Sequence, residues 1–116
     1  MDRQLTRYED KYRSLQAQVA ELGFISAGSV AQRLTACGKP GCRCSGKPPQ
    51  PHGPYFQWTR KVRGKTVTRR LSAAEALLYG EWIANARRLS TILADMEAVS
   101  AGAAEILLSN ADADDQ

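Results

Sequence analysis

Apolar residues recur at helical spacing near the N-terminus. Within residues 2–23 they fall three or four positions apart, as on a helix face that packs against another helix. The positions are Leu5, Tyr8, Tyr12, Leu15, Val19 and Leu22. Gly23 ends the pattern, so the sequence predicts an N-terminal helix within residues 1–23.

The middle of the chain alternates between apolar and polar residues. In residues 29–36, Val30, Leu34 and Ala36 share one side of an extended chain, which predicts a half-buried strand. Residues 55–71 predict a β-hairpin that turns at Arg63 and Gly64. The pairs expected from that turn are Phe56 with Leu71, Trp58 with Arg69, Arg60 with Val67 and Val62 with Lys65.

This register sorts the hairpin residues into two faces. The first face combines apolar residues with three cations that must reach past its edge: Phe56, Trp58, Val62, Val67, Leu71, Arg60, Lys65 and Arg69. The second face is polar and basic: Gln57, Thr59, Lys61, Thr66, Thr68 and Arg70. Such a division is typical of a small antiparallel sheet that is covered on one side only.

Helical spacing returns in the C-terminal part. Ser72 and Glu75 fit a capping box, which predicts a helix from about residue 73 to Val99. Its seam repeats that of the first helix, at Tyr79, Trp82, Ala86, Leu89, Leu93 and Met96. Residues 100–102 predict a bend, followed by a short helix through Leu108. Residues 110–116 predict a disordered acidic tail.

These elements define an α+β fold. A small antiparallel β-sheet with a zinc-binding loop, over residues 29–71, would lie between an N-terminal helix and the C-terminal helices of residues 73–109. A chain of 116 residues fits one small domain, here residues 1–109. It contains no apolar run of membrane-spanning length and no signal-peptide core, so we expect a cytoplasmic protein without membrane association.

Charge is segregated along the sequence. The net charge of +4 conceals a central segment, Leu22–Ala74, that holds ten Lys or Arg and no Asp or Glu. Segregation of this kind favours a polyanionic partner. A basic face that serves only solubility is the alternative.

The proline- and glycine-rich segment 37–54 contains all three cysteines and the only histidine. Their spacing is C-x4-C-x-C-x7-H, formed by Cys37, Cys42, Cys44 and His52. Three thiolates and an imidazole are a common tetrahedral set for structural Zn²⁺. Three cysteines in a reducing compartment favour a metal over a disulfide, and the metal would order a segment that is otherwise a poor helix or strand former.

Two alternatives for this segment stay open. His52 could pack in its turn without binding the metal, which would leave three thiolates and a fourth position for water. An open position is the pattern of catalytic zinc, but the central segment offers no local carboxylate as a general base. We therefore expect a protein that is not an enzyme.

The hairpin has the composition of a nucleic-acid contact. Residues 59–70 include six Lys or Arg among twelve residues, and a two- or three-stranded ribbon fits the major groove of DNA. The candidate nucleic-acid-binding residues are Arg33, Lys39, Arg43, Gln57, Arg60, Lys61, Arg63, Lys65, Arg69 and Arg70. Lys61, Lys65, Arg69 and Arg70 would contact phosphates, whereas Arg60, Arg63 or Gln57 would read bases. Tyr55, Phe56 and Trp58 could instead stack on unpaired bases of RNA or single strands, or, for Phe56 and Trp58, pack in the core.

The motifs CGKPGCRC, HGPY and GKTVTRRL, in this order before a long helix, resemble a family of small bacterial proteins of unknown function. That family is often encoded near transposases and other mobile-element genes, and the resemblance covers about residues 27–93. It implies the same zinc ligands and a basic sheet that ends at Arg69 and Arg70. Together with the charge pattern, it favours a DNA-binding accessory protein or regulator of a mobile element, whose protein partner would be a transposase or another protein. The rival hypothesis is an adaptor whose heptad helices grip a protein partner. The two helical seams could pair within one chain or between chains, and a homodimer would suit paired DNA contacts.

Overall fold

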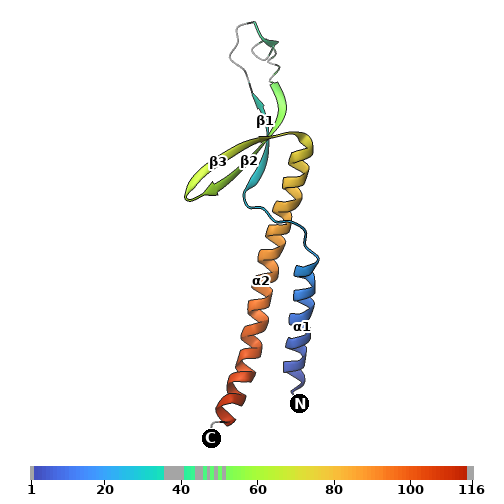
Figure 1. The fold of residues 1–116 in the computed structure, drawn as a ribbon, viewed down its shortest axis with the longest axis vertical. Coiled ribbons are helices and arrows are strands. Elements are labelled where there is room, and N and C mark those ends of the chain that lie inside the picture. Colours follow the sequence, from blue (N-terminus) through green and yellow to red (C-terminus); the bar gives the residue numbers. More distant parts are fainter. Residues whose placement is uncertain are drawn as a thin grey trace. The chain divides into compact units, whose positions relative to one another are not determined.

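The computed structural model describes residues 2–35, 41–43, 46, 48, 50 and 52–114. Its elements follow the order α1, β1, β2, β3 and α2 (Figure 1). Backbone contacts divide the chain into two compact units. Ile25–Ala84 form the sheet unit, and Met1–Phe24 with Asn85–Gln116 form the helical unit. The fold is therefore α+β, as predicted.

The sheet unit contains three antiparallel strands in the order β1-β2-β3. They are β1 (Ser29–Thr35), β2 (His52–Val62) and β3 (Lys65–Leu71). The predicted hairpin register is confirmed for all four of its pairs. Arg63 and Gly64 turn the chain with φ values of 51° and 81°, and two successive positive φ values suit the twist of a tight hairpin.

Strand β2 begins earlier than the sequence predicts, at His52 instead of residue 55. The register with β1 shifts between Arg33 and Thr35, so that Thr35 pairs with His52. Pro54 lies opposite this irregularity, where a missing backbone N–H costs no regular ladder bond. The proline was therefore a misleading signal for a loop.

The core of the sheet unit lies between the sheet and the start of α2 (Ala73–Asp114). Trp58, Leu71, Ala76 and Ile83 are buried, and Tyr79 stacks on Trp58 with 4.2 Å between ring centroids. The predicted apolar face is thus confirmed at Trp58 and Leu71. It is wrong at the two ends of the strands, where Leu34 is 62% exposed and Val62 40% exposed.

The segment that enters β1 is fixed by hydrogen bonds. The indole Nε1 of Trp58 donates to the carbonyl oxygen of Ala27 over 2.9 Å. The backbone N–H of Ser26 donates to the carbonyl oxygen of Trp82 over 3.1 Å. Gly28 has a φ of +97°, and a Cβ atom there would clash with the carbonyl oxygen of Thr59. Only glycine allows the chain to pass so close to β2.

The helical unit pairs α1 (Arg3–Ala20) with the C-terminal part of α2. The carboxylate of Asp2 caps α1 by accepting hydrogen bonds from the N–H groups of Gln4 and Leu5. The helix ends at Ala20, three residues before the predicted end at Gly23. Leu15 of α1 and Ile92 of α2 are the buried apolar residues of this unit within the described part of the chain.

Helix α2 differs from the prediction in being unbroken from Ala73 to Asp114. Neither the bend at residues 100–102 nor a disordered segment at residues 110–114 is found. Gly102, which looked like a helix breaker, instead makes room for a side chain. A Cβ atom at Gly102 would lie 2.6 Å from Cζ of Tyr8. Within residues 2–35, 41–43 and 52–114, no helix combines the length and hydropathy needed to cross a membrane.

Candidate nucleic-acid interface

The sheet presents a polar face on the side opposite its core, which we name the outer face. Side chains alternate along a strand, and directly paired residues point to the same side. The register therefore groups the outer-face residues Ser29, Ala31, Arg33, Tyr55, Gln57, Thr59, Lys61, Thr66, Thr68 and Arg70. This is the wet and basic face that the sequence predicts, extended by β1. It contains no carboxylate.

Cations occupy the two ends of the outer face. Arg33 and Arg70 lie near the end from which β2 starts, and Arg33 pairs with Tyr55 across β1 and β2. The guanidinium Cζ of Arg70 lies 4.3 Å from the ring centroid of Tyr55. A guanidinium held by its face on an aromatic ring keeps its N–H edges available for a phosphate. Lys61 lies at the opposite end, next to the hairpin turn.

The centre of the outer face is uncharged. Gln57 and Thr59 of the middle strand are half-buried there. Gln57 pairs with Ala31 on one side and Arg70 on the other. The hydroxyls of Thr59 and Thr68 are 3.4 Å apart and form a cross-strand hydrogen bond. The outer face therefore has hydrogen-bonding groups in the middle and positive charge towards its ends.

Three other hairpin cations, Arg60, Lys65 and Arg69, lie on the inner face, and two of them have structural contacts. The guanidinium Cζ of Arg60 lies 3.9 Å from the ring centroid of Trp58, and its Nη1 is buried without a hydrogen-bond partner among the described residues. Arg69 forms a 3.5 Å ion pair with Glu75. The prediction that Arg60 reaches past the edge of this face is wrong, because its guanidinium lies back over the ring of Trp58. Lys65 and the turn residue Arg63 are exposed.

The capping box at the start of α2 is confirmed. The N–H of Ser72 donates to Oε1 of Glu75 over 2.9 Å, and the N–H of Glu75 donates to Oγ of Ser72 over 3.1 Å. The hydrogen bonds from the backbone and side chain of Ser72, assisted by the charge of Arg69, lower the pKa of Glu75 below its usual value. Glu75 is thus held as a carboxylate beside the helix N-terminus, where negative charge is favourable.

The three aromatic residues considered for base stacking divide between the two faces. Trp58 is buried, and Phe56 packs against the same core cluster. Tyr55 lies on the outer face, where the guanidinium of Arg70 lies over its ring. The core-packing alternative thus fits Phe56 and Trp58.

The predicted metal ligands lie mostly outside the described residues. This holds for Cys37, Cys44 and the side chain of His52, and also for the candidate cation Lys39. Cys42 is half-buried. The part of the chain that the structure describes contains no group of three or more His, Cys, Asp or Glu that could hold a metal. The backbone of His52 pairs with that of Thr35. Cys37 follows Thr35 by two residues, so Cys37 and His52 stand at the two ends of the loop in sequence.

Arg43 has a role in the loop that the sequence did not suggest. Its carbonyl oxygen accepts hydrogen bonds from the N–H groups of Gly46 and Gln50, over 3.2 and 3.1 Å. The side chain of Arg43 is exposed. A glycine-containing turn is consistent with these bonds, but the choice of acceptor could not be read from the sequence.

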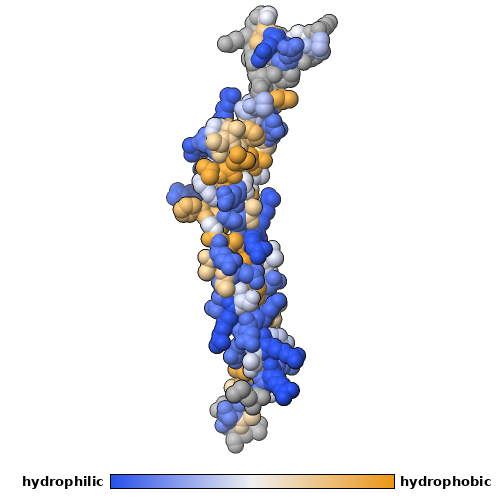
Figure 2. Space-filling model, turned by 90° about the vertical axis from the view of Figure 1, so that its right-hand side faces the viewer, coloured by the Kyte–Doolittle hydropathy of each residue, from blue (hydrophilic) through white to orange (hydrophobic). Residues whose placement is uncertain are grey.

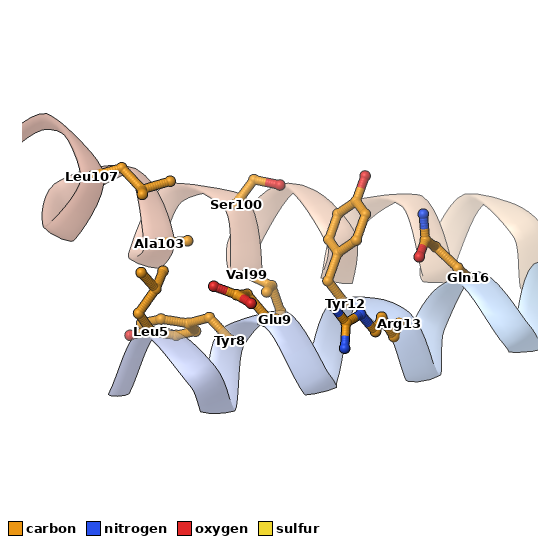
Figure 3. Close-up of a pocket in the computed structure, with 10 residues that line it drawn as sticks. All are labelled: Leu5, Tyr8, Glu9, Tyr12, Arg13, Gln16, Val99, Ser100, Ala103 and Leu107. Atoms are coloured by element: carbon orange, nitrogen blue, oxygen red, sulfur yellow. The ribbon is translucent and has the colours of Figure 1, made fainter. Parts of the chain in front are cut away.

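The helical unit offers a second kind of surface. A groove of about 330 Å³ runs between α1 and α2 (Figure 3) and is lined by Leu5, Tyr8, Glu9, Tyr12, Arg13, Gln16, Val99, Ser100, Ala103 and Leu107. Another, of about 510 Å³, is lined by Tyr12, Leu93, Met96, Glu97, Ser100, Ala101 and Ala104. Leu93, expected in the seam, is 50% exposed. Figure 2 shows apolar patches among the polar side chains of one face of the molecule.

Comparison with known proteins gives one finding. The family model described as Domain of unknown function (DUF6788) matches residues 3–80. The match spans α1, the three strands and the first residues of α2. No curated protein and no solved structure matches the chain.

Proposed function

Since the chain belongs to the DUF6788 family of domains of unknown function, we propose a function from the outer face itself: non-enzymatic binding of double-stranded DNA. The protein would act as an accessory factor or regulator, with the segment 37–52 stabilised by Zn²⁺. The observation that carries the proposal is the charge arrangement of the outer face. Arg33 and Arg70 stand at one end, Lys61 stands at the other, and no carboxylate lies between them.

The dimensions of this arrangement suit a duplex. Tyr55 and Lys61 are six residues apart on β2, which corresponds to about 20 Å of extended strand. The major groove is about 12 Å wide and has a row of phosphates along each side. Cations at the two ends of β2 therefore fit phosphates on both sides of a groove, while the uncharged centre faces the bases.

The aromatic residues support a duplex over a single strand. Proteins that bind single strands without sequence preference stack successive bases on several exposed rings. Here Trp58 is buried and Phe56 contacts the core, so the outer face offers Tyr55 without an aromatic neighbour from β2. Binding through phosphates and base edges is the mode that the remaining residues favour.

A zinc ion bound in the segment 37–52 would support DNA binding by the outer face. Cys37, Cys42, Cys44 and His52 would hold it, because thiolates and imidazole are its preferred ligands. A bound structural zinc supplies folding free energy to a segment rich in proline and glycine. Lys39 and Arg43 lie between the ligands in sequence and would add cations next to the end of the sheet that carries Arg33.

A salt titration tests the proposal. Three to five phosphate contacts predict that log K for a duplex falls by roughly 2.7–4.5 for each tenfold rise in salt. Replacing Arg33, Lys61 and Arg70 together by Glu should abolish binding. The matched control replaces Arg3, Arg7 and Lys11, three exposed cations of α1, by Glu and should bind as the wild type does. Duplex affinity that is absent at low salt, or that survives the outer-face triple change, would refute the function.

The grooves of the helical unit support a second candidate, an adaptor that binds a protein through α1 and α2. Leu93 and Leu107 are each about half exposed and line these grooves. Under this function, Leu93→Glu should abolish capture of a partner from a lysate, whereas the outer-face triple change should leave it intact. Capture that survives Leu93→Glu but is lost in the outer-face triple change would instead favour the DNA-binding function.

A further inference from the structure

We propose that Gln57 is the residue through which the outer face reads base sequence, and that it selects an A·T pair at the centre of the bound site. The inference rests on the proposed binding of double-stranded DNA and deepens it. The sequence alone left three candidates for base reading, namely Arg60, Arg63 and Gln57.

The structure separates these three residues by their position. Arg60 points to the inner face, where its guanidinium lies 3.9 Å from the centroid of Trp58. Arg63 occupies the hairpin turn with a φ of 51°, at the tip of the sheet and not on its face. Gln57 lies on the outer face of the middle strand, between β1 and β3.

The neighbours of Gln57 leave its amide available. Ala31, its partner on β1, has only a methyl group, which cannot compete for hydrogen bonds. The partner on β3 is Arg70, whose guanidinium lies over Tyr55. Thr59, the next outer-face residue of β2, is engaged with Thr68 over 3.4 Å. At the uncharged centre of the face, Gln57 is therefore the side chain whose planar group has a donor and an acceptor without a hydrogen-bond partner among the described residues.

The chemistry of a carboxamide fixes the expected base. In the major groove, the amide oxygen of glutamine accepts from N6 of adenine while its NH₂ donates to N7. The flanking cations would hold the sheet on the phosphates, so that the amide meets the base edges in a constant pose. A carboxylate in the same place would lose the donor and accept instead from N4 of cytosine.

The test is selection of bound sequences from a pool of random duplexes at one fixed salt concentration, followed by sequencing. Wild-type protein should enrich one A·T pair, with a preference of roughly 5- to 150-fold over the other pairs. Gln57→Ala should lose this preference while its affinity for the unselected pool stays within a few-fold, which also shows that the variant is folded. Gln57→Glu should move the preference at that position towards C·G.

The matched control is Gln32→Ala. Gln32 is an exposed glutamine of β1 that pairs with Phe56 and so belongs to the inner face. This change should leave the selected sequence unaltered. If wild-type protein binds duplexes without preference, or if the preference persists in Gln57→Ala, the inference is overturned while DNA binding stands. If wild-type protein retains no duplex at low salt, the proposed function fails, and the inference with it.

Discussion

Single residues with little chemistry of their own fix the path of this chain, and Gly28 is the clearest example. It combines a positive φ with a backbone approach that excludes even a methyl group. The segment that precedes it contributes the carbonyl of Ala27, which accepts the hydrogen bond of Trp58. The sequence shows a glycine before a strand, but the contact with Thr59 depends on a register that only the folded sheet defines.

We expect Gly28→Ala to destabilise the protein by more than the roughly 1–3 kcal/mol of an unfavourable φ alone. The excess comes from the contact of the new Cβ with the carbonyl oxygen of Thr59. Gly64→Ala is the control, since Gly64 also has a positive φ of +81° but open space around it. Urea unfolding of both variants gives the comparison. Equal losses would show that the close approach contributes nothing.

Glu75 gives a prediction on pH. Its pKa is lowered in the folded state, chiefly by the hydrogen bond from the backbone of Ser72, so the capping box adds stability above the unfolded pKa of a glutamate. That stability is lost as the pH falls through the lowered folded pKa. Glu75→Gln keeps a hydrogen-bonding side chain but should remove this pH-dependent contribution.

The measurement is the unfolding midpoint of wild type and Glu75→Gln at neutral and at acidic pH. The advantage of the wild type should shrink on acidification. Glu105→Gln, on the exposed surface of α2, is the matched control for loss of a carboxylate. An advantage that grows at low pH would contradict the assignment. Ser72→Ala should in addition cost about 1 kcal/mol at either pH, as for other helix caps.

Among the elements, the strands and their register were predictable and the length of α2 was not. Alternation and the turn at Arg63 and Gly64 define the hairpin, because a two-residue turn leaves one register. In α2 the same kind of rule failed at Gly102. A glycine reads as a helix end in sequence, but here it accommodates the ring of Tyr8, and this contact joins residues too distant in the chain for any local rule.

The single seam predicted for α2 was also too simple. Ile83 and Ile92 are both buried, yet nine residues, or two and a half turns, separate them, so no one seam contains both. Periodicity detects one apolar face at a time. The first part of α2 belongs to the sheet unit and the remainder belongs to the helical unit. The helix therefore needs more than one apolar face.

We expect the effect of Gly102→Ala to change sign with the residue at position 8. In the wild-type background the new Cβ would lie 2.6 Å from Cζ of Tyr8, so the helical unit should lose stability. In a Tyr8→Ala background the same change should stabilise by about 1 kcal/mol, the usual preference for alanine over glycine within a helix. Gly80→Ala, which meets open space, should stabilise in both backgrounds. A double-mutant cycle measured by urea unfolding checks this.

At the scale of the whole molecule, the sequence predicted the fold class, the basic face and its charge asymmetry. It placed Arg60, Lys65 and Arg69 on one face but could not predict which of them are used internally, because the contacts of Arg60 with Trp58 and of Arg69 with Glu75 depend on side-chain conformation. The zinc prediction rests on the residue types and spacing of Cys37, Cys42, Cys44 and His52. It remains a prediction about ligand chemistry, to be tested by metal analysis.

Purified protein should contain about one zinc per chain, and a chelator should remove it. Cys44→Ser should lower the zinc content and weaken duplex binding, since the loop then loses its constraint next to Arg33. His52→Ala distinguishes a site with four protein ligands from one with three. If the variant retains zinc, the three thiolates hold the metal and the fourth position is open. Protein that is metal-free as purified, with full duplex affinity, would contradict the zinc proposal.

Both tryptophans of the chain, Trp58 and Trp82, belong to the sheet unit, and Tyr79 contacts both rings. Indole fluorescence therefore reports on that unit, whereas the far-ultraviolet circular dichroism is dominated by α1 and the long α2. Followed together during denaturation, the two signals reveal whether the halves of this small protein come apart in one step or in succession, without any label being added.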